Sequence, residues 1–195
     1  IEPAGTLSVS GYRLDVRNLG VASRPVSAEE AGYADDPEYT GYTFLRPSNL
    51  DGVRRIKGVE VEYSQQLVFL PRWARGLSVF GSLTRVVTGI PLAGVVPKAA
   101  NGGVRFSNHK FNLQLRSTWS AARISSISST QTQWQYERIM FDVSGGWKLG
   151  RSYELTLSGR NILNSPNRGY VNEPGLLRIN FYYGAVWTLG LRGRF

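Results

Sequence analysis

Two groups of ionisable residues in this chain are spaced so that they can do chemistry. Asp35, Asp36 and Glu38 surround Pro37, and closely spaced carboxylates supply the hard oxygen ligands that Ca²⁺ prefers. A solvated acidic loop is the simpler interpretation of the same residues. The second group is mostly basic, and each member stands in a stretch where polar and apolar residues alternate: Arg116, Arg138, Asp142, Lys148, Glu154, Arg160, Arg178, Arg192 and Arg194.

Catalytic groupings are sparse. The single histidine, His109, lies between Asn108 and Lys110 in a predicted turn, with no nucleophile and acid arranged around it. The serine-rich run 125–129 lacks the G-x-S-x-G context of an activated serine. The chain has no cysteine, so neither a disulfide framework nor a thiolate metal site is available. We therefore expect neither an enzyme nor a bound cofactor.

The elements that position these charges are predicted to be strands. Over residues 178–195 the odd-numbered positions are mainly apolar, among them Trp187, Leu189, Leu191 and Phe195, and the even-numbered positions include Arg178, Arg192 and Arg194. Side chains alternate across a strand with period two, so one face suits hydrocarbon and the other suits water. Transmembrane β-barrel strands have this pattern. Soluble strands usually alternate over only about five or six residues.

Seven further strands follow from the same alternation. The clearest are 110–122, 138–149 and 152–163, followed by 57–69 and 77–88, while 99–107 and 6–18 are weaker. The strand at 6–18 changes phase around Gly11, which indicates either a bulge or a wrong assignment. The fold class predicted is therefore all-β, as an antiparallel transmembrane β-barrel of about eight consecutive strands.

Composition is consistent with this class. The chain has 195 residues and a formal net charge of +9. No stretch reaches the roughly 18 consecutive apolar residues of a membrane helix, so any crossing must use strands. The mean hydropathy of −0.22 fits a barrel, because polar residues facing the lumen dilute the apolar residues that face lipid. Basic charge also suits polyanions, but the arginines alternate with aliphatic residues and do not cluster among aromatics as nucleic-acid binding requires.

The predicted connections alternate in length. Those at 164–177, 123–137 and 19–56 are long and 89–98 is intermediate, whereas Gly150-Arg151, Asn108-His109 and 70–76 are short. Outer-membrane barrels have short periplasmic turns and long extracellular loops. The alternation places the C-terminus at the periplasmic rim, and it places the 19–56 loop, with its acidic cluster Asp35, Asp36 and Glu38, outside the cell.

The chain resembles the C-terminal part of TonB-dependent outer-membrane receptors. The segment 155–164, ending in Asn161-Ile162-Leu163-Asn164, resembles the penultimate strand of that family, and 183–195 resembles its closing strand. Lys57-Gly58-Val59-Glu60-Val61-Glu62 resembles an upstream strand of the same barrels. The likeness spans roughly residues 55–195, and residues 1–54 carry little of it.

The resemblance implies a plugged barrel of about 22 strands, which needs about 220 residues in strands alone. We therefore expect 1–195 to be the C-terminal part of a longer receptor in the bacterial outer membrane, with the plug domain absent. The start at Ile1, without an initiator methionine, is consistent with that expectation. The implied partners are outer-membrane lipid, the missing plug and strands, the TonB complex reached through the missing part, and the barrel assembly machinery, with no nucleic acid.

The predicted function is the barrel wall of a receptor for energy-coupled uptake of a scarce solute, such as an iron chelate, a vitamin or a glycan. One alternative is a self-contained eight-stranded barrel acting as an anchor or adhesin, and another is a soluble basic β-protein that binds polyanions. The alternating charges are candidates for the lumen-facing side. By resemblance to outer-membrane proteins, an assembly signal is expected at Phe195, Leu191, Leu189 and Trp187.

Overall fold

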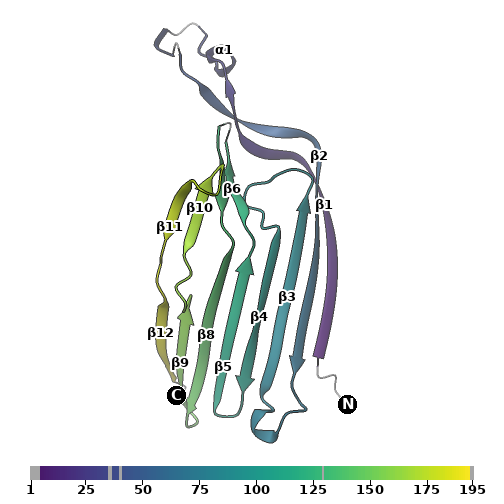
Figure 1. Ribbon diagram of the computed structural model, residues 1–195, viewed down its shortest axis with the longest axis vertical. Helices are drawn as coiled ribbons and strands as arrows, with labels where there is room; N and C mark the ends of the chain where they lie inside the picture. Colours follow the sequence, from purple (N-terminus) through teal and green to yellow (C-terminus); the bar gives the residue numbers. More distant parts are fainter. Residues whose placement is uncertain (1–4, 35–36, 40, 129, 194–195) are drawn as a thin grey trace.

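The computed structural model describes residues 5–34, 37–39, 41–128 and 130–193, mostly in antiparallel strands (Figure 1). The main sheet has eight strands in the order β1-β2-β3-β4-β5-β8-β9-β12. Their bounds are β1 Gly5–Val26, β2 Phe44–Gln66, β3 Leu77–Thr88, β4 Lys98–Ser107, β5 Phe111–Ser120, β8 Arg138–Leu149, β9 Tyr153–Arg160 and β12 Val186–Gly193. These eight strands confirm the predicted fold class.

A second sheet stands above the first at one rim (Figure 1). It has four strands in the order β11-β10-β7-β6, with bounds β6 Arg123–Ile127, β7 Thr132–Gln135, β10 Asn167–Val171 and β11 Leu177–Phe181. Three single turns of helix complete the structure: α1 Ala28–Ala31, η1 Pro37–Tyr39 and η2 Arg72–Ala74. No helix within the described ranges is long and apolar enough to cross a membrane.

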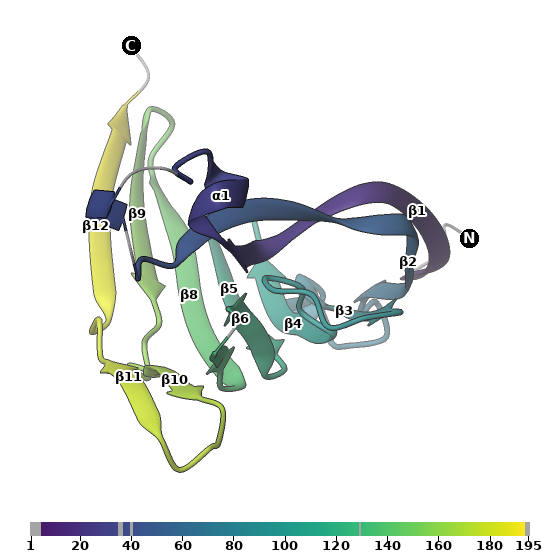
Figure 2. The same cartoon turned by 90° about the horizontal axis from the view of Figure 1, so that it is seen from above.

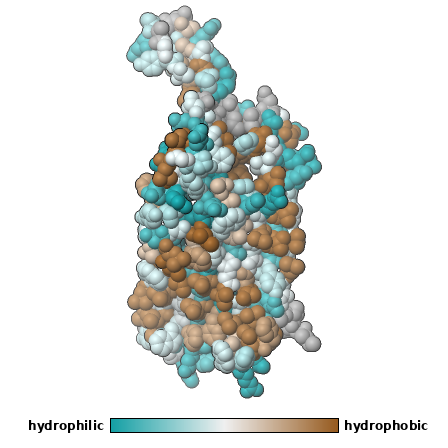
Figure 3. All heavy atoms as spheres, viewed as in Figure 1, coloured by the Kyte–Doolittle hydropathy of each residue, from teal (hydrophilic) through white to brown (hydrophobic). Residues whose placement is uncertain are grey.

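The main sheet is an arc whose two faces differ in chemistry. Seen from above, it curves from β12 to β1 and leaves these two edges apart (Figure 2). The face seen in Figure 3, which is the convex one, carries a broad apolar band over its lower half. The register puts Leu189, Leu157, Gly145 and Leu113 in one row of that band.

The apolar residues of this band have no protein core to pack into. Val26 and Ala74 are the buried hydrophobic residues within the described part of the chain, whereas Leu7, Leu113 and Leu189 are 67%, 50% and 70% exposed. A contiguous apolar surface of this kind requires a nonaqueous partner. The convex face is therefore the apolar face that the alternation predicted, and its composition suits hydrocarbon.

Short and long connections lie at opposite rims, as predicted (Figure 1). The turns 108–110 and 150–152 are short and lie at the rim where β1 begins and β12 ends, and the segments 121–137 and 161–185 lie at the other rim. The predicted difference in length fails for one pair. The connection 67–76 contains η2 and is no shorter than 89–97 on the opposite side.

The prediction that residues 19–56 form a loop is wrong. Instead of a loop, β1 and β2 continue pairing beyond the sheet, from Leu19 opposite Leu50 to Val26 opposite Phe44, with two irregularities in register. Only residues 27–43 connect the strands. Comparison of Figures 1 and 3, which share one view, shows that this part of the hairpin lies beyond the apolar band. In water both of its faces are wetted, so backbone pairing persists there without the alternation that revealed the other strands.

The phase change at Gly11 is not a bulge. Pairing between β1 and β2 is regular from Gly5 to Arg17. Leu7 and Val9 share the convex face, and farther along the strand Tyr12 and Leu14 fall on the other face. The apolar side of the strand therefore changes at Gly11 although the backbone continues without interruption.

The predicted strand 178–195 is two strands. β11 ends at Phe181 in the second sheet and β12 begins at Val186 in the main sheet. Gly184 lies between them with φ of 78°, a conformation that favours glycine. The odd-numbered apolar positions continue through both strands, so sequence periodicity cannot reveal the break.

Substitution on neighbouring residues of β9 tests the two faces. Leu157 lies on the convex face, 47% exposed, and Ser158 lies on the opposite face between Ser144 and Thr188. Leu157→Arg should lower the free energy of unfolding by about 2–4 kcal/mol, because the charge enters hydrocarbon. Ser158→Arg, which adds the same side chain on the wet face, should change it far less. Urea unfolding in phospholipid vesicles, followed by tryptophan fluorescence, measures both, and equal losses would contradict the assignment.

Candidate functional site: the concave polar face and its upper corner

The concave face of β5, β8, β9 and β12 gathers most of the charges singled out in the sequence. In the strand register Arg116 lies opposite Asp142, and Glu154 lies between Lys148 and Arg192. Arg192 Nη1 is 3.9 Å from Glu154 Oε2, with the arginine side chain 73% exposed. Exposed pairs of this kind contribute about 0–1 kcal/mol. Arg192 and Glu154 therefore remain available to other groups on this face.

Three predicted positions have other surroundings. Arg160 is on the same face opposite Val186, where the register gives it no charged neighbour on β12. Arg178 belongs to β11 of the second sheet, where its guanidinium donates to Gln133 Oε1. Its expected place on a spanning strand is therefore wrong, because the predicted strand 178–195 is divided. Arg194 lies outside the described residues.

Arg138 and Asp142 of β8 form hydrogen bonds to the segment that follows β9, which we call the upper corner of the wall. Arg138 Nη2 donates to the Ser165 carbonyl oxygen at 2.8 Å, and the Asp142 Oδ1 atom accepts from the Asn161 backbone N–H at 2.8 Å. The Arg138 Nε atom is buried without a hydrogen-bond partner among the described residues. Both side chains thus hold the segment that follows β9, which sequence reasoning did not foresee.

Asn161 is the centre of this corner. It is a buried polar residue, 9% exposed, with φ of 51°. Its Oδ1 atom accepts from the Ser165 N–H at 2.8 Å, and its Nδ2 atom donates to the carbonyl oxygens of Ser165 at 3.3 Å and Gly184 at 3.5 Å. Asn164, with φ of 49°, accepts from the Gly184 N–H at 3.0 Å. The Asn-Ile-Leu-Asn segment therefore ends β9 and fixes the chain just before β12.

The predicted outer loops 123–137 and 164–177 supply β6, β7 and β10 of the second sheet, and β11 comes mainly from the start of the predicted strand 178–195. Trp134 stacks on Tyr170 with ring centroids 6.0 Å apart, and Tyr136 lies 4.8 Å from the same ring. The Arg168 guanidinium lies 5.3 Å from the Tyr136 ring centroid. Asn172 Oδ1 accepts from the Thr132 N–H at 2.8 Å. The β-branched and aromatic residues of 130–136 have the composition of a strand and are the signal that periodicity alone misses.

The remaining candidates do not form a site among the described residues. Asp35 and Asp36 lie outside the described residues, and Glu38 is exposed in η1 at the hairpin tip. No group of possible metal ligands is found in the described ranges. His109 is an exposed turn residue, and Ser125 Oγ donates to the Gln133 carbonyl oxygen at 3.2 Å. At the tip, Tyr33, Tyr39 and Phe44 pack ring against ring.

Three of the four predicted assembly residues lie on the last described strand. Trp187, Leu189 and Leu191 share the convex face of β12, and Phe195 is outside the described residues. β12 pairs with β9 on one side, and β1 pairs with β2 on one side. Within the described residues the other edge of each strand has no partner strand.

Curvature, the apolar convex face and the charged concave face define the wall of a transmembrane β-barrel. A family model described as "TonB dependent receptor-like, beta-barrel" matches residues 2–162, and the chain belongs to this family of transport proteins. Among solved structures, the chain is similar to one named "Copper transporter OprC", with a TM-score of 0.67 and 13% sequence identity over 99% of this chain. The chain spans 29% of the length of that protein. No curated protein sequence matches.

Substitution of Asn161 tests the corner. Asn161→Ala removes the side-chain hydrogen bonds and places alanine at positive φ, so the free energy of unfolding should fall by about 2–4 kcal/mol. Asn172→Ala is the matched control, because Asn172 also has positive φ (57°) and accepts one backbone N–H, but in the second sheet. Urea unfolding in vesicles should show the smaller loss for the control. If the free energy of unfolding falls no more for Asn161→Ala than for Asn172→Ala, the corner does not contribute specially to the stability of the wall.

Proposed function

We propose that this chain is the C-terminal barrel wall of a TonB-dependent receptor in the bacterial outer membrane. The receptor takes up a scarce solute, such as an iron chelate, a vitamin or a glycan. Energy coupling belongs to a plug domain and a TonB contact in parts of the receptor outside residues 1–195. The observation that carries the proposal is the curved sheet itself, which has a bare apolar outer face, a charged inner face and two open edges.

The open edges favour a segment of a larger barrel over a self-contained one. Each backbone N–H or C=O left unpaired in hydrocarbon costs several kcal/mol, and a row of such groups runs along both β1 and β12. Further strands that pair with these two edges remove that cost. The adhesin alternative requires β1 and β12 to pair with each other, whereas the arc leaves them apart. A soluble polyanion-binding protein would leave the whole convex apolar face in water.

In the complete receptor the concave charges face the plug. Arg116 and Lys148 are available for hydrogen bonds to plug residues or for guiding an anionic solute, whereas Asp142 is engaged by the Asn161 N–H. Arg192 pairs with Glu154, which follows the short turn 150–152, and the rim of short turns is the periplasmic rim in this proposal. Arg192 is thus suited to contacts with the plug or with periplasmic partners.

Uptake by the full-length receptor tests the function. Cells that depend on the receptor should accumulate a labelled iron chelate, vitamin, glycan or copper complex, the last included because of the name of the similar structure. Accumulation should stop when the proton gradient is collapsed, while binding of the solute at the cell surface persists. The proposal would be contradicted if the uptake of each of these solutes depended neither on the proton gradient nor on the receptor gene.

Deletion of Phe195 tests the assembly signal. Recognition of a terminal strand by β-augmentation uses main-chain hydrogen bonds for affinity and alternate side chains for specificity. Removing Phe195 from the receptor should therefore reduce the amount inserted in the outer membrane several-fold, measured by membrane fractionation and heat-dependent gel mobility. Thr188→Ser is the control, because it alters the opposite face of β12. Unchanged insertion without Phe195 would show that the machinery reads another feature.

A further inference from the structure

The convex face of β1 to β4 carries cations immediately above the apolar band. The register sets Arg13 opposite Lys57 and Arg85 opposite Lys98, and Lys57 of β2 is displaced by two residues from Val59, which pairs with Arg85. All four side chains are exposed. Neighbouring strands are about 4.8 Å apart, so these cations form one patch. We call Arg13, Lys57, Arg85 and Lys98 the basic belt.

The belt borders the apolar band directly. Val9, Val61 and Leu83 lie on the same face in the row that begins the band, and Val87 lies within the belt, 52% exposed. At this level the apolar side of β1 changes from the convex to the concave face. The convex face therefore leaves hydrocarbon here and enters the head-group layer, on the side of the long connections.

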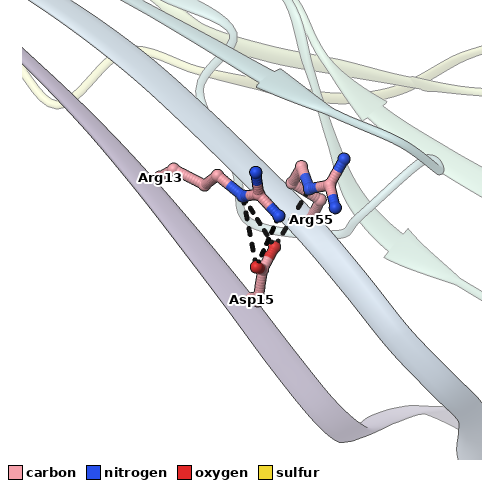
Figure 4. A network of polar contacts seen from close by, with 3 residues as sticks. All are labelled: Arg13, Asp15 and Arg55. Carbon is pink, nitrogen blue, oxygen red and sulfur yellow. Dashed lines mark hydrogen bonds and ion pairs between the residues drawn. The ribbon is translucent and has the colours of Figure 1, made fainter.

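Among the four cations of the belt, Arg13 has a carboxylate partner in the described part of the chain and the other three do not. Like charges directly opposite in a sheet are destabilising, and the register places two such pairs side by side. Glu60 is on the concave face, where the Thr84 hydroxyl donates to it at 3.4 Å, and Glu62 has the same parity. Asp15 is the carboxylate on the convex side, and it is engaged by Arg13 at 2.8 Å and Arg55 at 3.0 Å (Figure 4). Within the described residues Lys57, Arg85 and Lys98 form no ion pair.

We propose that the basic belt binds the phosphate groups of a phosphorylated glycolipid in the outer leaflet. Each phosphate would lie between opposed cations, which converts like-charge repulsion into charge-assisted hydrogen bonds, and the acyl chains would cover Val9, Val61 and Leu83. The adjoining apolar surface favours an amphiphile over an acidic protein. The inference rests on the proposed outer-membrane location but not on energy-coupled uptake, so either can fail alone.

Lipid titration of the purified full-length receptor tests this site. The delipidated receptor in nonionic detergent is titrated with a bisphosphorylated lipid A, and bound lipid is counted by native mass spectrometry. The double variant Arg85→Gln/Lys98→Gln should bind about tenfold more weakly, because cations at a membrane surface attract anionic lipid. The control Lys110→Gln/Arg151→Gln removes the same charge from turns at the opposite rim and should bind like the parent. Heat-dependent gel mobility verifies that each variant is folded.

Four outcomes of the lipid titration would overturn the proposal. They are equal affinities of the belt variant and the parent, an equal loss in the control, equal binding of dephosphorylated lipid A by the parent, and displacement of the lipid by inorganic phosphate at matched concentration. Recovery of an acidic membrane protein in place of lipid, by the parent but not the variant, would also overturn it. Loss of lipid binding in the belt variant with uptake intact would support the site and leave the transport function untouched.

Discussion

The structure depends on the requirement that backbone N–H and C=O groups in hydrocarbon be paired within the protein. Strands β2 to β9 of the main sheet satisfy this requirement on both sides, whereas β1 and β12 satisfy it on one side. Once the backbone groups are paired between neighbouring strands, the side chains need only be apolar on the face toward hydrocarbon and polar on the face toward water. This explains how a sheet with almost no buried hydrophobic residues is a stable element of a larger wall. It also explains why the two edges, and not any pocket, indicate that the wall extends farther.

The same constraint locates the boundary of the hydrocarbon. On β1 the convex positions change from Leu7 and Val9 to Arg13 and Asp15, while the concave positions gain Tyr12 and Leu14. Tyr12 covers Gly58 on the facing strand, where an added Cβ atom would lie 2.3 Å from the ring. The strand continues without a break across this boundary. The backbone conformation therefore does not change there, and only the types of side chain do. The basic belt and the apolar band are thus two parts of one face, and their chemistry suits two different layers of a membrane.

The sequence predicted the spanning strands well and the outer structures poorly, for one physical reason. Lipid on one side and water on the other impose alternation, so 77–88, 138–149 and 152–163 were recognisable. In water both faces of a hairpin are wetted, so the extension of β1 and β2 and the second sheet left no such pattern. Arg178 was misplaced because apolar odd-numbered positions continue across Gly184. The corner at Asn161 depends on contacts with Asp142 and Gly184, which lie 19 and 23 residues away in the chain and which periodicity cannot reveal.

The low sequence identity to a structurally similar chain arises because most positions of a spanning strand accept many residue types. An identity of 13% accompanies a TM-score of 0.67 over nearly the whole chain, because any apolar residue suits the convex face and almost any polar residue suits the concave one. Specific residue types are required only where the backbone itself is constrained. Gly103 lies under Phe80 and Gly159 under Trp187, where an added Cβ atom would approach the rings to 2.8 and 2.6 Å. Asn161 combines positive φ with hydrogen bonds to two segments. Such positions, and not the many leucines and valines of the band, fix the register in which the wall is built.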